Sequence, residues 1–503
     1  MFIVDLNRES FEYDVQALVK AFYSEEQVYV LTPMTREDRR LELAEKARLK
    51  IDIFEDSAEF VLDGDHSLFD LEKERAALKF PMAEEEEERT AVLREIQSRG
   101  FKDGFKRYLY SLLSEATGGK HLPWGNLTGI RPTKIAYGML EQGRSDRFIL
   151  DDYRQNHYAS TPKAELSLEI AKRERQLLSG IHYQGGYSLY IGIPFCPTTC
   201  LYCSFTSFPI AGYRDLVDRY LDCLIREMEL TADVMKGQIL DSVYIGGGTP
   251  TTLEPEQLDR LLIKLKNLFD FSAVQEFTVE AGRADSITED KLKVLYAHGV
   301  GRISVNPQTM KQETLDIIGR RASVVQVEQA YALARKVGFD NINMDLILGL
   351  PGELEEDVQH TIDRVVALEP DSLTVHSLAI KRASKLNQWI QENGVAMLHN
   401  TDETIAIAAE GAKRLGLVPY YLYRQKNMSG NLENVGYARE GKLGLYNILI
   451  MEEVQTIVAL GAGSITKRVY PDGLIERCEN VKEVTQYIGR IDEMLKRKKT
   501  LLQ

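Results

Sequence analysis

Short apolar runs alternate with amphipathic helical patterns through the middle of the chain. The runs that predict strands are Tyr187–Pro194, Ser242–Gly246, Glu276–Ala281, Arg302–Asn306, Asn341–Leu346 and Ser372–Ser377. The helical patterns between them are Tyr213–Lys236, Glu254–Phe269, Glu289–His298, Val324–Val337 and Leu354–Leu368. Strands that alternate with helices of this length form right-handed βαβ units, so the strands should be parallel. The pattern predicts an α/β fold with an incomplete parallel (β/α) barrel of about six units; a doubly wound open sheet is the alternative.

The remaining sequence predicts extensions on both sides of this barrel. Residues 1–82 mix strand-like runs with a helical pattern and predict a small α+β domain. Residues 83–185 are predicted to be mainly helical, interrupted by the Gly- and Pro-bearing segment Trp124–Lys134. Residues 186–382 form the predicted barrel, and residues 383–503 a mixed C-terminal domain that covers the barrel mouth. A length of 503 residues is consistent with several domains.

Composition and charge exclude several classes of protein. Apolar residues make up 44% of the chain and charged residues 27%, which is typical of a globular protein with a real core. The net charge of −14 argues against a general affinity for nucleic acids or anionic membranes. No segment approaches the roughly 18 apolar residues of a membrane span, and the N-terminus lacks a signal-peptide pattern. We therefore expect a cytoplasmic protein.

Three of the five cysteines, Cys196, Cys200 and Cys203, fall within the sequence LYIGIPFCPTTCLYCSF, directly after the first predicted barrel strand. Three thiols cannot all pair with one another, so this cluster predicts a metal site. Three protein ligands leave a coordination position open, as in a catalytic zinc site or at one iron of a 4Fe–4S cluster. The alternatives are a structural zinc site completed by a distant histidine or by Cys478, or simply buried thiols.

The phrases YIGIPFC and CLYCSF resemble the signature of radical S-adenosylmethionine (SAM) enzymes, which carry three cysteines after the first barrel strand. Within them, the chain is similar to the oxygen-independent coproporphyrinogen III dehydrogenase (oxidase)-like family over roughly Tyr187 to Lys467. The first 180 residues, with WGNLTGIRPTK, resemble its longer Firmicutes-type branch. The resemblance implies a 4Fe–4S cluster on the three cysteines. It also implies that SAM binds the open iron and is cleaved by an electron from the cluster to methionine and a 5′-deoxyadenosyl radical.

Further motifs lie at or just past the ends of the other predicted strands, where parallel sheets bind ligands. In YIGGGTPTTL the glycines permit close backbone approach to a ligand, although a tight turn alone would also use them. Arg320 suits a carboxylate, and the adjacent Arg321 is the alternative. With these positions, the resemblance implies SAM contacts from Tyr190, Tyr202, Gly247, Gly248, Thr249, Glu280, Gln308, Arg320, Asp345, Ala379 and Ile465.

The resemblance implies an oxidoreductase of porphyrin and haem biosynthesis. It would decarboxylate two propionates of coproporphyrinogen III to vinyl groups, giving protoporphyrinogen IX, with a reducing electron donor such as flavodoxin or ferredoxin. Neither nucleic acid nor a membrane is an expected partner, and no catalytic side chain is assigned. The candidate propionate donors are Arg131, Lys134, Lys381, Arg382, Tyr420, Tyr421, Tyr423 and Arg424.

Two positions depart from the family pattern. Asn306 replaces a usual glycine, and Phe205 stands where the best-known dehydrogenase has a fourth cysteine. A haem-binding chaperone branch of the same group also has phenylalanine at that place. Two alternatives to the dehydrogenase therefore stay open: a chaperone that binds and delivers haem, and a radical SAM enzyme that acts on haem or another tetrapyrrole.

Overall fold

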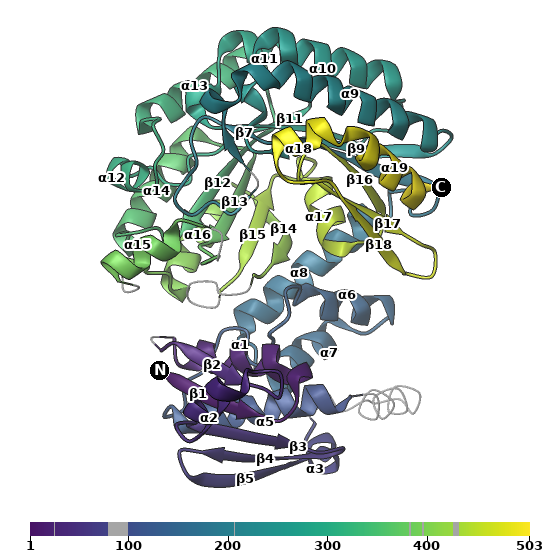
Figure 1. The fold of residues 1–503 in the computed structure, drawn as a ribbon. Helices are drawn as coiled ribbons and strands as arrows, with labels where there is room; N and C mark the ends of the chain where they lie inside the picture. Colours follow the sequence, from purple (N-terminus) through teal and green to yellow (C-terminus); the bar gives the residue numbers. More distant parts are fainter. Residues whose placement is uncertain (25, 79–98, 206, 382–383, 395–396, 426–431) are drawn as a thin grey trace. The chain divides into compact units, whose positions relative to one another are not determined.

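The computed structural model describes residues 1–24, 26–78, 99–205, 207–381, 384–394, 397–425 and 432–503 (Figure 1). The chain forms two compact units. Unit 1 comprises Met1–Lys172 and Arg424–Leu432, and unit 2 comprises Arg173–Tyr423 and Glu433–Gln503. Among the described residues, none of the helices combines the length and the apolar character that crossing a membrane would require.

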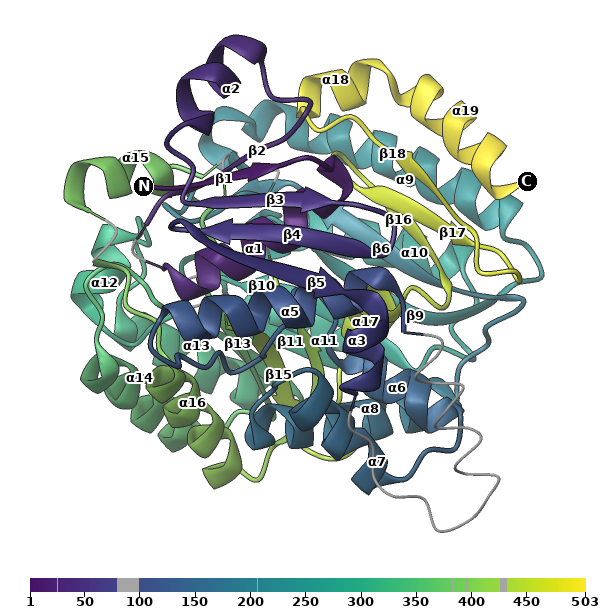
Figure 2. The ribbon, with the colours of Figure 1, turned by 90° about the horizontal axis from the view of Figure 1, so that it is seen from below.

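Unit 1 contains a mixed five-stranded sheet in the order β2-β1-β3-β4-β5 (Figure 2). Its strands are β1 (Phe2–Leu6), β2 (Val28–Leu31), β3 (Leu49–Ile53), β4 (Ser57–Leu62) and β5 (Asp65–Asp70). Its helices include α1 (Glu12–Phe22), α2 (Glu37–Ala44), α3 (Leu71–Ala76), α5 (Phe101–Ala116), α6 (Thr133–Glu141) and α7 (Asp146–Asp151). Buried side chains of α1 recur every three or four residues and share one apolar core with the sheet and α5.

Six parallel strands of unit 2 lie side by side in sequence order. They are β6 (Gly186–Ile193), β9 (Ile239–Gly247), β10 (Glu276–Gly282), β11 (Arg302–Val305), β12 (Ile342–Leu348) and β13 (Ser372–Ser377). The helices between them are α9 (Val217–Val234), α10 (Pro255–Leu268), α11 (Glu289–Ala297), α12 (Gln312–Ile317), α13 (Val324–Val337) and α14 (Glu355–Leu368). The predicted partial barrel is thus confirmed. A doubly wound sheet would need a reversal of strand order, which these six strands do not show.

Residues after the barrel extend the same sheet at both edges. Strands β14 (Val418–Tyr423) and β15 (Asn434–Ala438) continue antiparallel from β13. At the other edge, β16 (Thr456–Leu460) pairs parallel with β6, beyond the six strands that the sequence predicts. The remaining elements are β17 (Ile465–Val469), β18 (Ile475–Glu479), α15 (Leu386–Asn393), α16 (Asp402–Arg414), α17 (Leu445–Glu452), α18 (Val484–Gly489) and α19 (Ile491–Leu502). Helix α8 (Thr161–Leu178) contains the boundary between the units.

Candidate functional site

The three clustered cysteines lie in a short loop at the carboxyl end of β6. Cys196 ends the two-residue strand β7 (Phe195–Cys196), which pairs with β8 (Phe208–Pro209) after the loop. Cys196 and Cys200 are buried free thiols, and Cys203 is half-buried. Burial, with a smaller contribution from the neighbouring cysteines, raises the pKa of Cys196 to about 11, although the hydrogen bond from Thr249 opposes this rise. The three thiols therefore lie in one loop directly after the first barrel strand, two of them buried.

This set of donors fits an iron–sulfur cluster. Thiolates are the soft ligands that iron–sulfur clusters use, and each cysteine binds a different iron, so the sulfur atoms need not converge on one point. In the part of the chain that the structure describes, no three His, Cys, Asp or Glu side chains are grouped to hold a single metal ion. Cys223 lies on α9 and Cys478 on β18, outside this loop.

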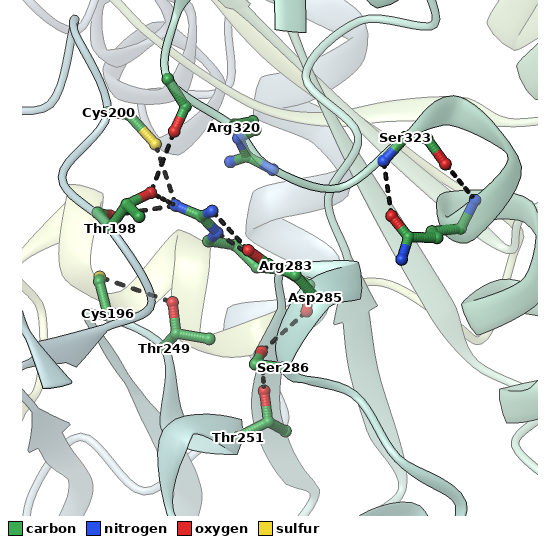
Figure 3. Close-up of polar contacts among 12 residues, drawn as sticks. Cys196, Thr198, Cys200, Thr249, Thr251, Arg283, Asp285, Ser286, Arg320 and Ser323 are labelled. Atoms are coloured by element: carbon green, nitrogen blue, oxygen red, sulfur yellow. Dashed lines mark hydrogen bonds and ion pairs between the residues drawn. The ribbon is translucent and has the colours of Figure 1, made fainter. Parts of the chain in front are cut away.

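Thr249 and Arg283 donate hydrogen bonds to cysteine sulfurs (Figure 3). Thr249 Oγ1 donates to Cys196 Sγ at 3.5 Å, and Arg283 Nη1 donates to Cys200 Sγ at 3.6 Å. Thr249 belongs to the predicted SAM contacts, but Arg283 does not. The sequence signal that could have identified Arg283 is its position directly after β10. It lies two residues before Asp285, with which it forms an ion pair. The sequence pattern alone singles out only Glu280 on that strand.

The glycine turn after β9 packs directly against the beginning of the cysteine loop. Gly247 has a φ of +108°, which a larger side chain would strain. A Cβ atom on Gly248 would lie 2.5 Å from the Phe195 carbonyl oxygen. The amide of Gly248 donates to the Ile193 carbonyl at 2.7 Å, and that of Thr249 to Phe195 at 2.7 Å. This close packing brings the turn with the predicted SAM contacts Gly247, Gly248 and Thr249 beside Cys196.

Glu280 lies on β10 and is held by an aromatic neighbour. Tyr244 Oη donates to Glu280 Oε1 at 2.6 Å, and the ring of Tyr244 stacks on Tyr190 with centroids 6.2 Å apart. Burial raises the pKa of Glu280 to about 7, although the hydrogen bond from Tyr244 opposes this rise. Two predicted SAM contacts, Tyr190 and Glu280, are thereby linked through a tyrosine that was not predicted.

Gln308 combines an unusual backbone with an unpaired polar atom. Its φ is +71°, and its buried Oε1 has no hydrogen-bond partner among the described residues. Both features are typical of functional sites rather than of stable cores. Asp345 lies within β12 rather than at its end, and its Oδ1 accepts a hydrogen bond from Asn343 Nδ2 at 2.7 Å. Asn306, at the family's usual glycine position, accepts from the Asp345 amide at 3.2 Å.

Arg320 contacts the cysteine loop directly. Its Nη2 donates to Tyr202 Oη at 3.1 Å, and its Nη1 donates to the Asn306 carbonyl at 2.5 Å. Arg321 is exposed, so Arg320 is the arginine that the fold turns toward the loop. Ala379 follows the end of β13 and is half-buried, while Ile465 begins β17 and is 41% exposed. The SAM contacts of these residues remain predictions.

The candidate propionate donors fall into distinct environments. Lys381 is half-buried beside Cys203: burial lowers the pKa of Lys381, and Cys203 partly opposes this shift. Tyr420 and Tyr421 are buried, and Tyr423 shares a 3.3 Å hydrogen bond with His376. Arg382 lies outside the described residues. Arg131, Lys134 and Arg424 belong to unit 1.

Arg424 has a structural role within unit 1. It is 5% exposed, its backbone amide donates to the Ile130 carbonyl at 2.7 Å, and its Nη1 donates to the Leu127 carbonyl at 2.5 Å. These two contacts hold the Gly- and Pro-bearing segment Trp124–Lys134 in place. Its guanidinium also lies 5.8 Å from the centre of the Trp124 ring.

Comparison with known proteins gives consistent matches. Residues 190–365 match the Radical SAM superfamily. The chain is 40% identical to the oxygen-independent coproporphyrinogen-III oxidase-like protein HemZ of Bacillus subtilis, over 78% of this chain and 80% of HemZ. It is 37% identical to the heme chaperone HemW of Bacillus subtilis, over 39% of this chain and 51% of HemW. It is 31% identical to the oxygen-independent coproporphyrinogen III oxidase of Escherichia coli, over 45% of this chain and 50% of that protein.

A solved structure supports the fold. The coproporphyrinogen III oxidase HemN from Escherichia coli, described as a radical SAM enzyme, aligns with a TM-score of 0.50 and 24% identity. The alignment covers 64% of this chain and 72% of HemN. At this level of identity the likeness concerns the architecture, and it agrees with the parallel barrel of unit 2.

Proposed function

Because the chain belongs to the oxygen-independent coproporphyrinogen III oxidase-like family of radical SAM proteins, we propose that it converts two propionates of coproporphyrinogen III to vinyl groups. Each propionate would lose a hydrogen atom from its β-carbon to the 5′-deoxyadenosyl radical, then carbon dioxide and one electron, which passes to a one-electron acceptor. The product would be protoporphyrinogen IX. The observation that carries the proposal is the group of three interacting thiols at the carboxyl end of the first barrel strand. Similarity over 80% of an oxidase-like relative supports the choice of substrate.

Radical SAM proteins use a 4Fe–4S cluster and SAM, which together supply a 5′-deoxyadenosyl radical when bound. In this chain Cys196, Cys200 and Cys203 would hold the cluster. Arg320 has the charge and shape for two-pronged binding of the SAM carboxylate. Glu280 could accept hydrogen bonds from the SAM ammonium group or a ribose hydroxyl, and the unpaired Gln308 Oε1 could accept another.

Among the candidate propionate donors, Lys381 interacts with Cys203 of the cysteine loop. We therefore propose that Lys381 binds a propionate group of the substrate. A lysine ammonium binds a carboxylate as a point charge, and its partial burial strengthens that attraction. The reaction also requires a reducing partner that delivers electrons to the cluster. Flavodoxin or ferredoxin are the classes of donor proposed for that role.

The deciding experiment is anaerobic turnover of the reconstituted protein with reductant, SAM and coproporphyrinogen III. We expect a divinyl product and two molecules of carbon dioxide per substrate. Lys381→Met should raise the KM for coproporphyrinogen about tenfold or more while cluster content stays unchanged, because one charged contact is lost. Lys413→Met, on an exposed lysine of α16, is the matched control. Absence of any vinyl product with a fully loaded cluster would reject the proposal.

Phe205 favours a second candidate, a protein that binds and delivers haem. It is 74% exposed beside Cys203, and an exposed aromatic ring suits stacking on a planar tetrapyrrole. The similarity to HemW, named as a heme chaperone, supports this reading. Stoichiometric haem binding without turnover of coproporphyrinogen would favour it over the oxidase. Formation of 5′-deoxyadenosine with haem, but not with coproporphyrinogen, would instead indicate a radical SAM enzyme that acts on haem.

A further inference from the structure

The geometry points to Arg283 and Asp285 as an ion pair that sets the reduction potential of the cluster. This inference rests on the proposal that the three clustered cysteines are its ligands. Arg283 follows β10 directly and is only 4% exposed. It reaches the cysteine loop 83 residues earlier in the chain, where it contacts Cys200. We regard it as a positioning residue that acts through a cysteine ligand.

Asp285 fixes the plane of the Arg283 guanidinium. Arg283 Nε donates to Asp285 Oδ1 at 3.0 Å, and its Nη2 donates to Asp285 Oδ2 at 2.7 Å. Such a two-pronged pair orients the guanidinium more firmly than a single contact could. The remaining nitrogen, Nη1, is thereby directed at the cysteine loop (Figure 3).

Three acceptors of the cysteine loop meet this nitrogen. Arg283 Nη1 donates to the Thr198 carbonyl at 3.0 Å, to Thr198 Oγ1 at 2.8 Å and to Cys200 Sγ at 3.6 Å. Thr198 Oγ1 itself donates to the Gly319 carbonyl at 3.0 Å, just after α12. The loop is therefore tied on one side to the end of β10 and on the other to the segment that leads to Arg320.

The turn that carries Arg283 is itself firmly held. Ser286 Oγ donates to the Arg283 carbonyl at 2.8 Å and shares a second 2.8 Å hydrogen bond with Thr251 Oγ1. Lys291 Nζ donates to the Thr251 carbonyl at 2.7 Å. These residues are buried, so the guanidinium is held in a defined position near the sulfur.

A donor on a cysteine sulfur and a nearby positive charge both stabilise the reduced cluster, which carries one more negative charge than the oxidised cluster. Hydrogen bonds to the sulfurs and net charge are the established determinants of iron–sulfur potentials. Arg283 should therefore raise the potential, and the carboxylate of Asp285 should lower it. Cys196 accepts from the neutral hydroxyl of Thr249, whereas Cys200 accepts from the charged guanidinium of Arg283.

Substitutions of Arg283 and of Asp285 should shift the reduction potential of the cluster in opposite directions, which provides a test. The reconstituted wild-type chain, Arg283→Gln and Asp285→Asn would be titrated anaerobically without SAM, with the cluster followed by absorbance and electron paramagnetic resonance. Arg283→Gln should lower the equilibrium constant for one-electron reduction at least tenfold, a shift of about 59 mV. Asp285→Asn should shift the potential upward. Arg335→Gln removes another arginine–aspartate pair, with Asp371, and should leave the potential unchanged.

A purely structural role would move both variants in the same direction or leave the potential unchanged, and either result would overturn the inference. Arg283→Lys keeps the charge. The reduction potential of Arg283→Lys should therefore stay close to that of the wild type, even if Arg283→Gln binds iron poorly. A fall in potential as large as the rise measured for Asp285→Asn would contradict the charge argument. If the wild-type chain itself takes up no iron, the cysteine site fails together with this inference. A loaded wild-type cluster with unshifted variants rejects this inference alone.

Discussion

Asp241 and Glu280 are carboxylates on neighbouring strands of unit 2, at opposite ends of the barrel. Near the start of β9, Asp241 is fully buried. It accepts hydrogen bonds from the His182 amide at 3.1 Å and from Gln455 Nε2 at 2.5 Å, and it also pairs with His182 Nδ1 at 2.7 Å. Near the end of β10, Glu280 has the Tyr244 hydroxyl as its side-chain donor, and burial raises the pKa of Glu280 to about 7.

The difference shows how one sheet divides stability and function between its two ends. The amino end pairs its carboxylate with several donors, which favours the folded state. The carboxyl end keeps a carboxyl group that burial penalises, and nearby Gln308 has a strained backbone and an unpaired oxygen. Such features persist where a ligand supplies the missing partner, and parallel barrels bind ligands at this end. Substitutions at the two ends should therefore change different properties.

The largest effect is expected from the cysteines at the carboxyl end. Replacing Cys196, Cys200 or Cys203 by alanine should abolish cluster binding and SAM cleavage, because a cluster site with two thiolates is incomplete. Iron analysis and 5′-deoxyadenosine formation would measure this loss. Cys223→Ala, on α9, should retain both properties. Continued SAM cleavage in any one of the three variants would contradict the proposed ligand set.

At the amino end, Asp241→Ala should act on stability instead. Removing this carboxylate takes one hydrogen-bond acceptor from Gln455 and the charged partner from His182, which should lower the free energy of unfolding by about 2–4 kcal/mol. Urea denaturation would measure the change, and the iron content of the folded fraction should remain that of the wild type. The matched aspartate–histidine pair is Asp259 with His298, 2.7 Å apart; Asp259 is 49% exposed, so Asp259→Ala should cost less than about 1 kcal/mol. Equal losses of stability from the two substitutions would remove the distinction between the buried and the exposed aspartate.

Glu280→Gln should change the pH dependence of stability. The pKa of Glu280 is about 7 in the folded chain and lower in the unfolded chain, so the folded chain binds more protons between these values. Stability from this group is therefore present at low pH and is lost as pH rises from about 4.5 to about 7. In urea denaturation without cofactors, the wild type should lose on the order of 1–3 kcal/mol relative to Glu280→Gln between pH 5 and pH 8. Parallel pH profiles for the two proteins would show that burial does not penalise the ionised Glu280.

The smallest effect should come from Thr249→Val, which keeps the side-chain shape and removes the hydroxyl donor to Cys196. A neutral donor stabilises the reduced cluster less than a charged one. The reduction potential should therefore fall by less than in Arg283→Gln. The same anaerobic titration would compare the two variants, and a larger shift from Thr249→Val would reverse the ranking of the two donors.

The local order of the barrel could be predicted from the sequence, because strand and helix patterns repeat over a few residues. Strand β13 and helix α13 have the predicted bounds, and the other barrel strands and helices for which the sequence predicts a range differ by only a few residues. The pairing of β16 with β6 could not be predicted, since it joins segments far apart in the sequence. The hydrogen-bond partners of individual polar side chains could not be predicted from the sequence either. Asp345 was expected at a strand end, yet it lies inside β12 and bonds Asn343.

The contact between Arg283 and Cys200 illustrates the same limit at the site. Strand order indicates that Glu280 and the cysteines lie at one edge of the sheet, but not how the chain turns after β10. That turn depends on the buried hydrogen bonds of Ser286 and Thr251. The residue types of the site could therefore be predicted from the sequence. The hydrogen-bond donors to the cysteine sulfurs could be identified only in the folded structure.

Arg424–Leu432 belongs to unit 1 although it follows the six barrel strands in the sequence. The hydrogen bond from Arg424 to the Leu127 carbonyl spans 297 residues. During translation, the N-terminal unit therefore leaves the ribosome before the segment that completes it has been made. It can reach its final hydrogen bonding only after those strands have been synthesised, and a fragment ending at Lys172 would lack the contacts that hold the Trp124–Lys134 segment.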